Sequence, residues 1–191
     1  MLKELVKKSR SYRGYDENRK ISREELLELV DCARYAPSSV NRQPFKYLLA
    51  YTQEDLDKIQ PLTGWARALP QMSLPHPGKC PTAFIVICQE TEWDADLKRY
   101  LRDVGIVAQT ILLAAAERDL GGIMIGNFNP ERIAKALQLP EHIVPMLIVA
   151  LGKPDEQIVL TEIENGESIN YYRDEQDIHY VPKRKLKDII I

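Results

Sequence analysis

Four short runs of the sequence are typical of strands, several of them apolar almost throughout, and they limit the possible folds more than any other feature. They are Phe45–Tyr51, Thr82–Cys88, Gly121–Gly126 and Pro145–Leu151. A strand with one face in water alternates apolar and polar residues, so runs of this kind indicate strands buried on both faces. Helices must then cover both sides of a small sheet. The order of predicted elements favours an α/β or α+β protein with three layers.

Two helices have clear starting signals. Ser22 and Glu25 form the serine–glutamate pair of a capping box, and apolar residues follow at helical spacing, which predicts a helix over about 22–35. Asn129 followed by Pro130 is a typical helix start, and this helix should reach about Leu137.

The longest periodic stretch runs from Glu92 to Arg118 and predicts a central helix. Gly105 and Ala114 on the same face would let another backbone approach closely. Packing within one chain and packing between two subunits both fit this pattern.

Size and charge exclude several classes of protein. The 191 residues suit one domain, 1–191, and a net charge of −2 argues against a nucleic-acid-binding protein. The N-terminus lacks the pattern of a signal peptide, and no apolar run is long enough for a membrane helix, so the expected compartment is the cytoplasm. Residues 152–191 are polar with little core-forming pattern, which predicts an arm that wraps around something.

The cysteines and histidines show no catalytic or metal-binding spacing. Cys32 and Cys88 are interpreted as buried apolar residues, whereas Cys80 lies in a loop and no second pair completes a metal shell with His76. His76, His142 and His179 fit no catalytic triad, so we expect each of them to be structural or exposed, and we expect no metal site.

Four segments carry polar or glycine-rich patterns that suit ligand binding. Three of them also have a simpler explanation: a solvated surface for the first, a helix-to-strand turn for the second, and a solubilising tail for the last. Arginine side chains match phosphate oxygens, and a glycine bend lets a flat ligand approach the backbone. The segments are Arg10–Arg13, Ala36–Phe45, Gly121–Pro130 and Lys183–Lys185. No dinucleotide or triphosphate glycine motif is present.

Taken together, these segments resemble the FMN-dependent nitroreductase family over nearly the whole chain. The Arg-Ser-x-Arg motif starts at Arg10, the Pro-Ser-Ser-x-Asn-x-Gln-Pro-aromatic motif starts at Pro37, and the Asp-x-Gly-x-x-Ala-Gln pattern starts at Asp103. The resemblance implies an α+β fold with α/β/α layers, a small mixed or antiparallel sheet covered by helices, and an intertwined homodimer in which the arm wraps the partner subunit.

The resemblance also implies a cofactor and its contacts. FMN would lie at the dimer interface, with Arg10, Ser11 and Lys183 or Arg184 on the phosphate and Arg13 near the N1 edge of the ring. The ring would be met by Asn41 and Gln43, by the backbone of Ile125 and Gly126, and by Pro37, Ser38 and Ser39 of the neighbouring subunit.

The implied activity is electron transfer from NAD(P)H to a nitroaromatic or quinone by a ping-pong mechanism, with the flavin performing the chemistry. Two alternatives stay open at this stage. One is a specialised flavin enzyme, either a reductive dehalogenase or a flavin-degrading enzyme. The other is a flavin-binding module without turnover.

Overall fold

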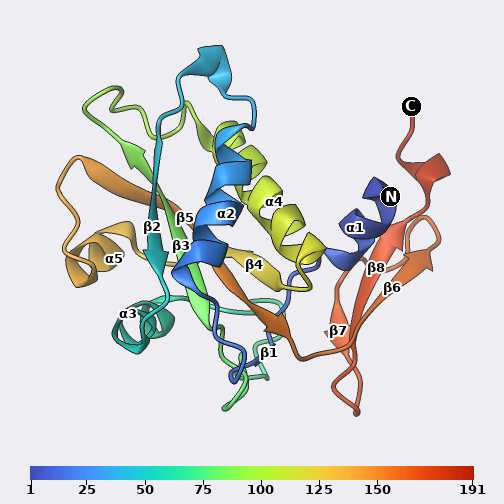
Figure 1. The fold of residues 1–191 in the computed structure, drawn as a ribbon. Helices are drawn as coiled ribbons and strands as arrows, with labels where there is room; N and C mark the ends of the chain where they lie inside the picture. Colours follow the sequence, from blue (N-terminus) through green and yellow to red (C-terminus); the bar gives the residue numbers. More distant parts are fainter.

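A computed structural model describes residues 1–191 and contains one main sheet, five helices and a smaller C-terminal sheet (Figure 1). In chain order the elements are α1 (Leu2–Lys8), β1 (Tyr15–Asp16), α2 (Arg23–Arg34), a 3-10 turn (Ser39–Asn41), β2 (Phe45–Ala50), α3 (Gln53–Ile59), a 3-10 turn (Gln60–Leu62), β3 (Ala83–Glu90), α4 (Leu101–Glu117), β4 (Gly121–Ile125), α5 (Pro130–Ala136), β5 (Ile143–Pro154), β6 (Ile158–Ile163), β7 (Tyr172–Arg173), β8 (His179–Arg184) and a last 3-10 turn (Leu186–Asp188). None of the helices is both long and apolar enough to cross a membrane.

The main sheet is antiparallel throughout and is organised around β5. One edge of β5 pairs with β3, which pairs in turn with β2. The other edge pairs with β4 over Ile148–Gly152, and β1 pairs with the two residues of β5 that follow Gly152. All four predicted strands are present, and β5 extends further at both ends than its apolar run suggested.

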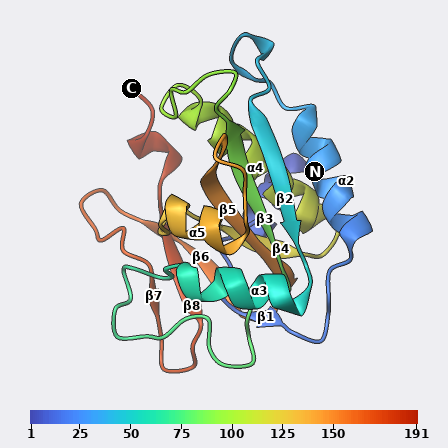
Figure 2. The same cartoon turned by 90° about the vertical axis from the view of Figure 1, so that its left-hand side faces the viewer.

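Helices cover both faces of this sheet, which confirms the three-layer prediction (Figures 1 and 2). Ile85 and Ile87 point into the core under α2 and α4, whereas Phe84 and Val86 point into the core under α3 and α5. All four side chains are fully buried. Each contributes ~1.5–3 kcal/mol by leaving water, and this is why β3 is apolar on both faces.

The two capped helices form as predicted. Ser22 Oγ accepts the Glu25 N–H at 3.2 Å and the Glu25 carboxylate accepts the Ser22 N–H at 2.9 Å, so the capping box is complete. Asn129 caps α5 through the Arg132 N–H at 2.9 Å, and Pro130 occupies the first turn.

The prediction of a helix from Glu92 is wrong, because α4 begins at Leu101. The preceding segment is held in turns by its own carboxylates: Asp94 accepts the Asp96 N–H, and Asp96 accepts the Lys98 N–H, both at 3.0 Å. Gln89 also donates to the Asp94 carbonyl at 2.7 Å. Aspartates that bond to nearby backbone N–H groups compete with a helix, and here they prevent it.

The C-terminal residues form a second sheet that the sequence did not reveal. β8 lies in its centre, parallel to β6 and antiparallel to β7, and this sheet stands beside the main one in Figure 1. We call residues 155–191 the arm. The last residues, Ile189, Ile190 and Ile191, are exposed. That the arm wraps a partner subunit stays a prediction.

Candidate functional site

The predicted site residues fall into two groups at opposite ends of the main sheet. Ser11 forms a bridge with Gly122, which lies opposite Leu151 of β5. Phe45, at the end of the 36–44 loop, lies opposite Gln89, which lies opposite Val144. At ~3.4 Å per residue these positions are roughly 20 Å apart along β5. One chain therefore does not bring Arg10 and Ser11 to Ser38, Asn41 and Gln43.

Arg10 and Ser11 lie where the chain leaves α1 and meets β4. Arg10 donates one N–H of its guanidinium to the Val6 carbonyl at 2.6 Å, but its Nε is buried without any partner. Burial lowers the pKa of Arg10. The Ser11 residue is exposed. A partly buried cation with a free donor beside an exposed hydroxyl is suited to an anionic group.

Arg13 is buried and turned toward the arm. Its guanidinium donates to the Ser11 carbonyl at 3.0 Å and lies 4.8 Å from the centre of the Tyr171 ring, and its backbone N–H donates to Glu156. Burial lowers the pKa of the guanidinium. The contact of Arg13 with the N1 edge of a flavin stays a prediction, because the side chain here contacts the arm.

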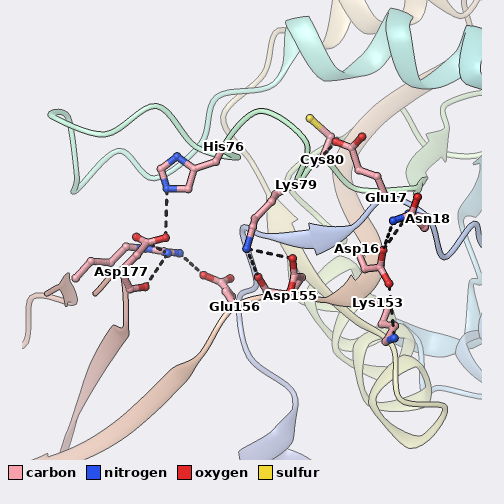
Figure 3. A network of polar contacts seen from close by, with 11 residues as sticks. Asp16, Glu17, Asn18, His76, Lys79, Cys80, Lys153, Asp155, Glu156 and Asp177 are labelled. Atoms are coloured by element: carbon pink, nitrogen blue, oxygen red, sulfur yellow. Dashed lines mark hydrogen bonds and ion pairs between the residues drawn. The ribbon is translucent and has the colours of Figure 1, made fainter. Parts of the chain in front are cut away.

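A polar cleft of about 590 Å³ separates the arm from the loop before β3. Figure 3 shows its walls, where His76 Nε2 lies 3.3 Å from Asp177 and Lys79 Nζ lies 3.1 Å from the Asp155 carboxylate. Deeper in, Arg173 and Glu156 form an ion pair whose side chains are only 3% and 5% exposed. This network could not be predicted from the sequence, because its members are polar residues scattered over three segments without a motif. His76 pairs with a carboxylate here.

The loop at the other end of the sheet has an unusual backbone. Val40, Asn41 and Gln43 all have left-handed conformations, with φ of 45°, 55° and 49°. For residues with a Cβ this costs ~1–2 kcal/mol each, and a β-branched valine is an extreme case. Such strain is often found at binding sites.

Side chains of the loop bond to one another. Ser38 Oγ accepts the Gln43 N–H at 2.9 Å, and Gln43 Nε2 donates to Asn41 Oδ1 at 3.1 Å. Pro37, Ser39, Asn41 and Gln43 are exposed, and Ser38 is half-buried. The loop is therefore stabilised by hydrogen bonds between its own residues, while its polar side chains remain exposed.

A residue outside the loop completes its support. Asp103, in the first turn of α4, accepts the Ser39 N–H at 2.7 Å and is only 5% exposed. The sequence placed Asp103 in a motif but assigned it no role. The sequence signal for such a role was an aspartate among the apolar residues of a predicted helix.

β4 ends at Ile125, which Gly126 follows, and the backbone contact of both residues with the flavin ring stays a prediction. Ile125 is buried, whereas Gly126 is exposed and a Cβ built on it would meet no atom within 4 Å. Gly122 differs, because a Cβ there would lie 2.4 Å from the Ala150 carbonyl oxygen, so this glycine is required for sheet packing.

The C-terminal basic residues are exposed at the end of β8. Lys183 lies opposite Glu162 of β6, and Arg184 donates to the Asp188 carbonyl. No hydrogen bond or ion pair joins either of them to Arg10 or Ser11. Their role at a phosphate stays a prediction.

Glu90, Glu92 and His142 form a cluster that the sequence did not reveal, with one potential ligand atom of each within 4.8 Å of the others. Pairing of β3 with β5 brings them together, and Lys46 Nζ lies 3.5 Å from the Glu90 carboxylate. The three cysteines are free, and burial raises the pKa of Cys88 to about 12, so this thiol is unreactive.

Comparison with known proteins shows the family to which the chain belongs. The family model described as the Nitroreductase family matches residues 6–153. The chain belongs to the nitroreductase family. A Methanothermobacter thermautotrophicus protein, provisionally named an NADH dehydrogenase/NAD(P)H nitroreductase, is 29% identical over 161 residues, which cover 80% of this chain and 77% of that protein.

Two other matches extend the comparison within the nitroreductase family. FMN reductase (NAD(P)H) of Bacillus subtilis is 25% identical over 174 residues, covering 85% of this chain and 69% of the reductase. The crystal structure of a nitroreductase family protein from Clostridium difficile superimposes with a TM-score of 0.63 at 27% identity, covering 80% of this chain and 84% of the other. The predicted nitroreductase-like α+β fold is thereby confirmed.

Proposed function

We propose that this nitroreductase-family protein binds FMN and passes electrons from NAD(P)H to an electron-poor acceptor, a nitroaromatic or a quinone. The observation that carries the proposal is Arg10, with a partly buried guanidinium and an unpartnered Nε beside the exposed Ser11. Family membership and the similarity to an FMN reductase support the same cofactor.

The shape of the region fits a molecule with a phosphate at one end and a flat ring at the other. Ser11 lies beside Gly122, and beyond Gly122 this edge of β4 has no strand partner. The edge runs to Gly126, where the backbone is open. At ~3.4 Å per residue the distance from Gly122 to Gly126 is roughly 13 Å. We infer that the phosphate lies at Arg10 and the ring at Ile125 and Gly126.

A second copy of the chain completes this site in the proposal. The loop containing Pro37, Ser38, Ser39, Asn41 and Gln43 lies at the far end of the sheet from Arg10 and exposes its polar groups. In a homodimer, the loop of one subunit would reach the ring bound by the other. Asn41 and Gln43, which both donate and accept hydrogen bonds, suit the mixed edge of an isoalloxazine.

The chain's own residues would bind and orient the reactants. Bound FMN would supply the redox chemistry, for which no amino-acid side chain is suited. Arg10 and Ser11 would anchor the phosphate, and the exposed Gly126 would leave the ring accessible to a planar substrate. Lys183 or Arg184 would add a second cation at the phosphate.

The cofactor proposal is tested with purified protein and one pair of variants. The protein should be yellow and release FMN when denatured. Arg10→Ala should weaken FMN binding, measured by quenching of flavin fluorescence, by roughly 1.5–3 kcal/mol. Lys7→Ala is the matched control, because Lys7 is an exposed cation on α1 that pairs only with Glu4. Colourless protein that FMN cannot reconstitute would refute the proposal.

The order of substrate binding gives a second test. If one pocket serves both the nicotinamide and the acceptor, the first must leave before the second enters. Double-reciprocal plots with NADH and a quinone should then show parallel lines, the pattern of ping-pong exchange. Intersecting lines would indicate two pockets. Failure of NADH or NADPH to bleach the bound flavin would indicate a binding module instead of an enzyme.

A further inference from the structure

The loop between α2 and β2 has a strained backbone, although the side chain at its tip makes almost no packing contacts. Val40, Asn41 and Gln43 are left-handed, and the Val40 side chain is 92% exposed. Such a backbone persists only when its surroundings hold it in place. Contacts within the loop, such as Ser38 Oγ with the Gln43 N–H, cannot fix the loop relative to the rest of the protein, because both partners belong to the loop.

Asp103 supplies the fixed point. Ser39 opens the 3-10 turn over Ser39–Asn41, and the first N–H of such a turn has no partner inside it. Ser38, the residue in the capping position, makes no capping bond with its side chain. Asp103 accepts the Ser39 N–H at 2.7 Å instead, so a helix distant in sequence caps this turn.

Asp103 is held in place by its position in a buried part of α4. It is the third residue of α4, it is only 5% exposed, and its neighbour Val104 is also buried. Hydrogen bonds to an ionised acceptor are shorter and stronger than neutral ones. The Ser39 amide is therefore fixed relative to the helix that packs under the main sheet.

We propose that Asp103 is a positioning residue for the cofactor loop: by capping the turn at Ser39 it sets the orientation in which Asn41 and Gln43 meet the flavin ring. This inference rests on the proposed function. Asp103 itself does not touch the cofactor, because its carboxylate lies beneath the loop. It acts through the backbone of Ser39.

Two substitutions separate this role from simple stability. Asp103→Ala removes the acceptor, whereas Asp103→Asn keeps an oxygen that can accept the Ser39 N–H. Ile111→Val is the matched control, since Ile111 is fully buried on the same helix but packs in the core away from the loop. All three variants and the wild type are compared as the full-length protein.

The expected results differ between the variants. Asp103→Ala should raise the Kd for FMN about tenfold or more, a change of about 1.4 kcal/mol. Asp103→Asn should bring the Kd back to within a few-fold of wild type. Ile111→Val should lower the unfolding midpoint and leave the Kd unchanged. In the protein without flavin, amide exchange at Ser39 should accelerate in Asp103→Ala alone.

Each outcome decides the proposal. If wild type binds FMN and Asp103→Ala binds it equally well, or if Ile111→Val weakens binding as much, Asp103 does not position the loop. If wild type itself fails to bind FMN, the proposed function is refuted. Amide exchange at Ser39 then still reports whether Asp103 holds the loop, so the two failures are distinguishable.

Discussion

His179 is the buried histidine of the protein. It is 1% exposed at the start of β8, its ring lies 5.3 Å from that of Tyr171, and neither ring nitrogen has a hydrogen-bond partner. Burial, with the charges of Arg13 and Arg173 adding to it, lowers the pKa of His179 to about 4. The imidazole is therefore neutral at physiological pH.

This histidine should make the protein less stable in mild acid. Because the folded-state pKa lies below the ordinary 6.5, the unfolded chain binds a proton that the folded protein does not. The stabilisation is complete above pH 6.5 and is lost as the pH falls toward 4. Between pH 7.5 and pH 5 the loss should be about 2 kcal/mol.

The measurement is urea unfolding at both pH values and one protein concentration. His179→Gln cannot titrate, so the drop in stability should be about 2 kcal/mol smaller than in wild type. His142→Gln serves as the control for loss of a histidine as such, because the His142 side chain is 38% exposed and not buried. An equal drop in wild type and His179→Gln would contradict the prediction.

At the scale of single residues, the sequence predicted which segments are polar and suited to ligand binding, but not which contacts hold them in place. Ser38, Asn41 and Gln43 were recognisable from the order of residue types in one loop. The contact of Asp103 with Ser39, and the direction in which Arg13 points, depend on segments more than sixty residues apart. Local pattern carries no information about such contacts.

At the scale of elements, the buried carboxylate of Glu156 links the arm to the body. Glu156 bonds both to Arg173 and to the backbone N–H of Arg13, so a single carboxylate connects β7 to the N-terminal segment. Without Glu156, Arg173 would keep only its contact with Asp177, at 3.0 Å, whose side chain is 43% exposed. Removing one partner of a buried pair costs ~3–5 kcal/mol when the other charge is left unpaired, so this is the upper bound here.

Glu156→Ala should therefore loosen the arm selectively. Limited proteolysis should cut within residues 157–191 faster than in wild type, while the main sheet stays intact. Glu164→Ala is the control, because Glu164 pairs with Lys185 at the surface, where ion pairs contribute ~0–1 kcal/mol. Equal cleavage rates in wild type and Glu156→Ala would show that the pair does not hold the arm.

Elements with strong local signals were predictable, and those stabilised by distant partners were not. The capped helices and the apolar strands formed as predicted, because both capping and burial depend on residues close together in the sequence. The helix expected from Glu92 failed, because aspartate turns replaced its first nine residues. The strands of the arm were missed because each one depends on pairing with another segment of the arm.

At the scale of the whole molecule, we predict an obligate homodimer. The two halves of the candidate site lie at opposite ends of the sheet, and α4 exposes Leu101 and Ile106. Sedimentation at micromolar concentration should give twice the chain mass of 21.9 kDa. A monomer of that mass that retains FMN would contradict the shared site.

Deleting residues 180–191 should weaken the dimer and the flavin site together. The deletion removes nearly all of β8, the strand with which both β6 and β7 pair, along with Lys183 and Arg184. Sedimentation and FMN titration of the same sample would measure both effects. Loss of only one of them would separate the arm's two predicted roles.

The central place of β5 also bears on how the protein emerges from the ribosome. β1, β3 and β4 all pair with a strand that is synthesised after them, from Ile143 to Pro154. At ~5–20 residues per second, several seconds pass between the emergence of β3 and that of β5. During this time β3, which is apolar from Ala83 to Cys88, has only β2 beside it and an unpaired edge, which is a typical site of aggregation. A nascent chain stalled before Ile143 should therefore leave this edge of β3 open to other chains, whereas a chain extended past Pro154 has the strand that pairs with it.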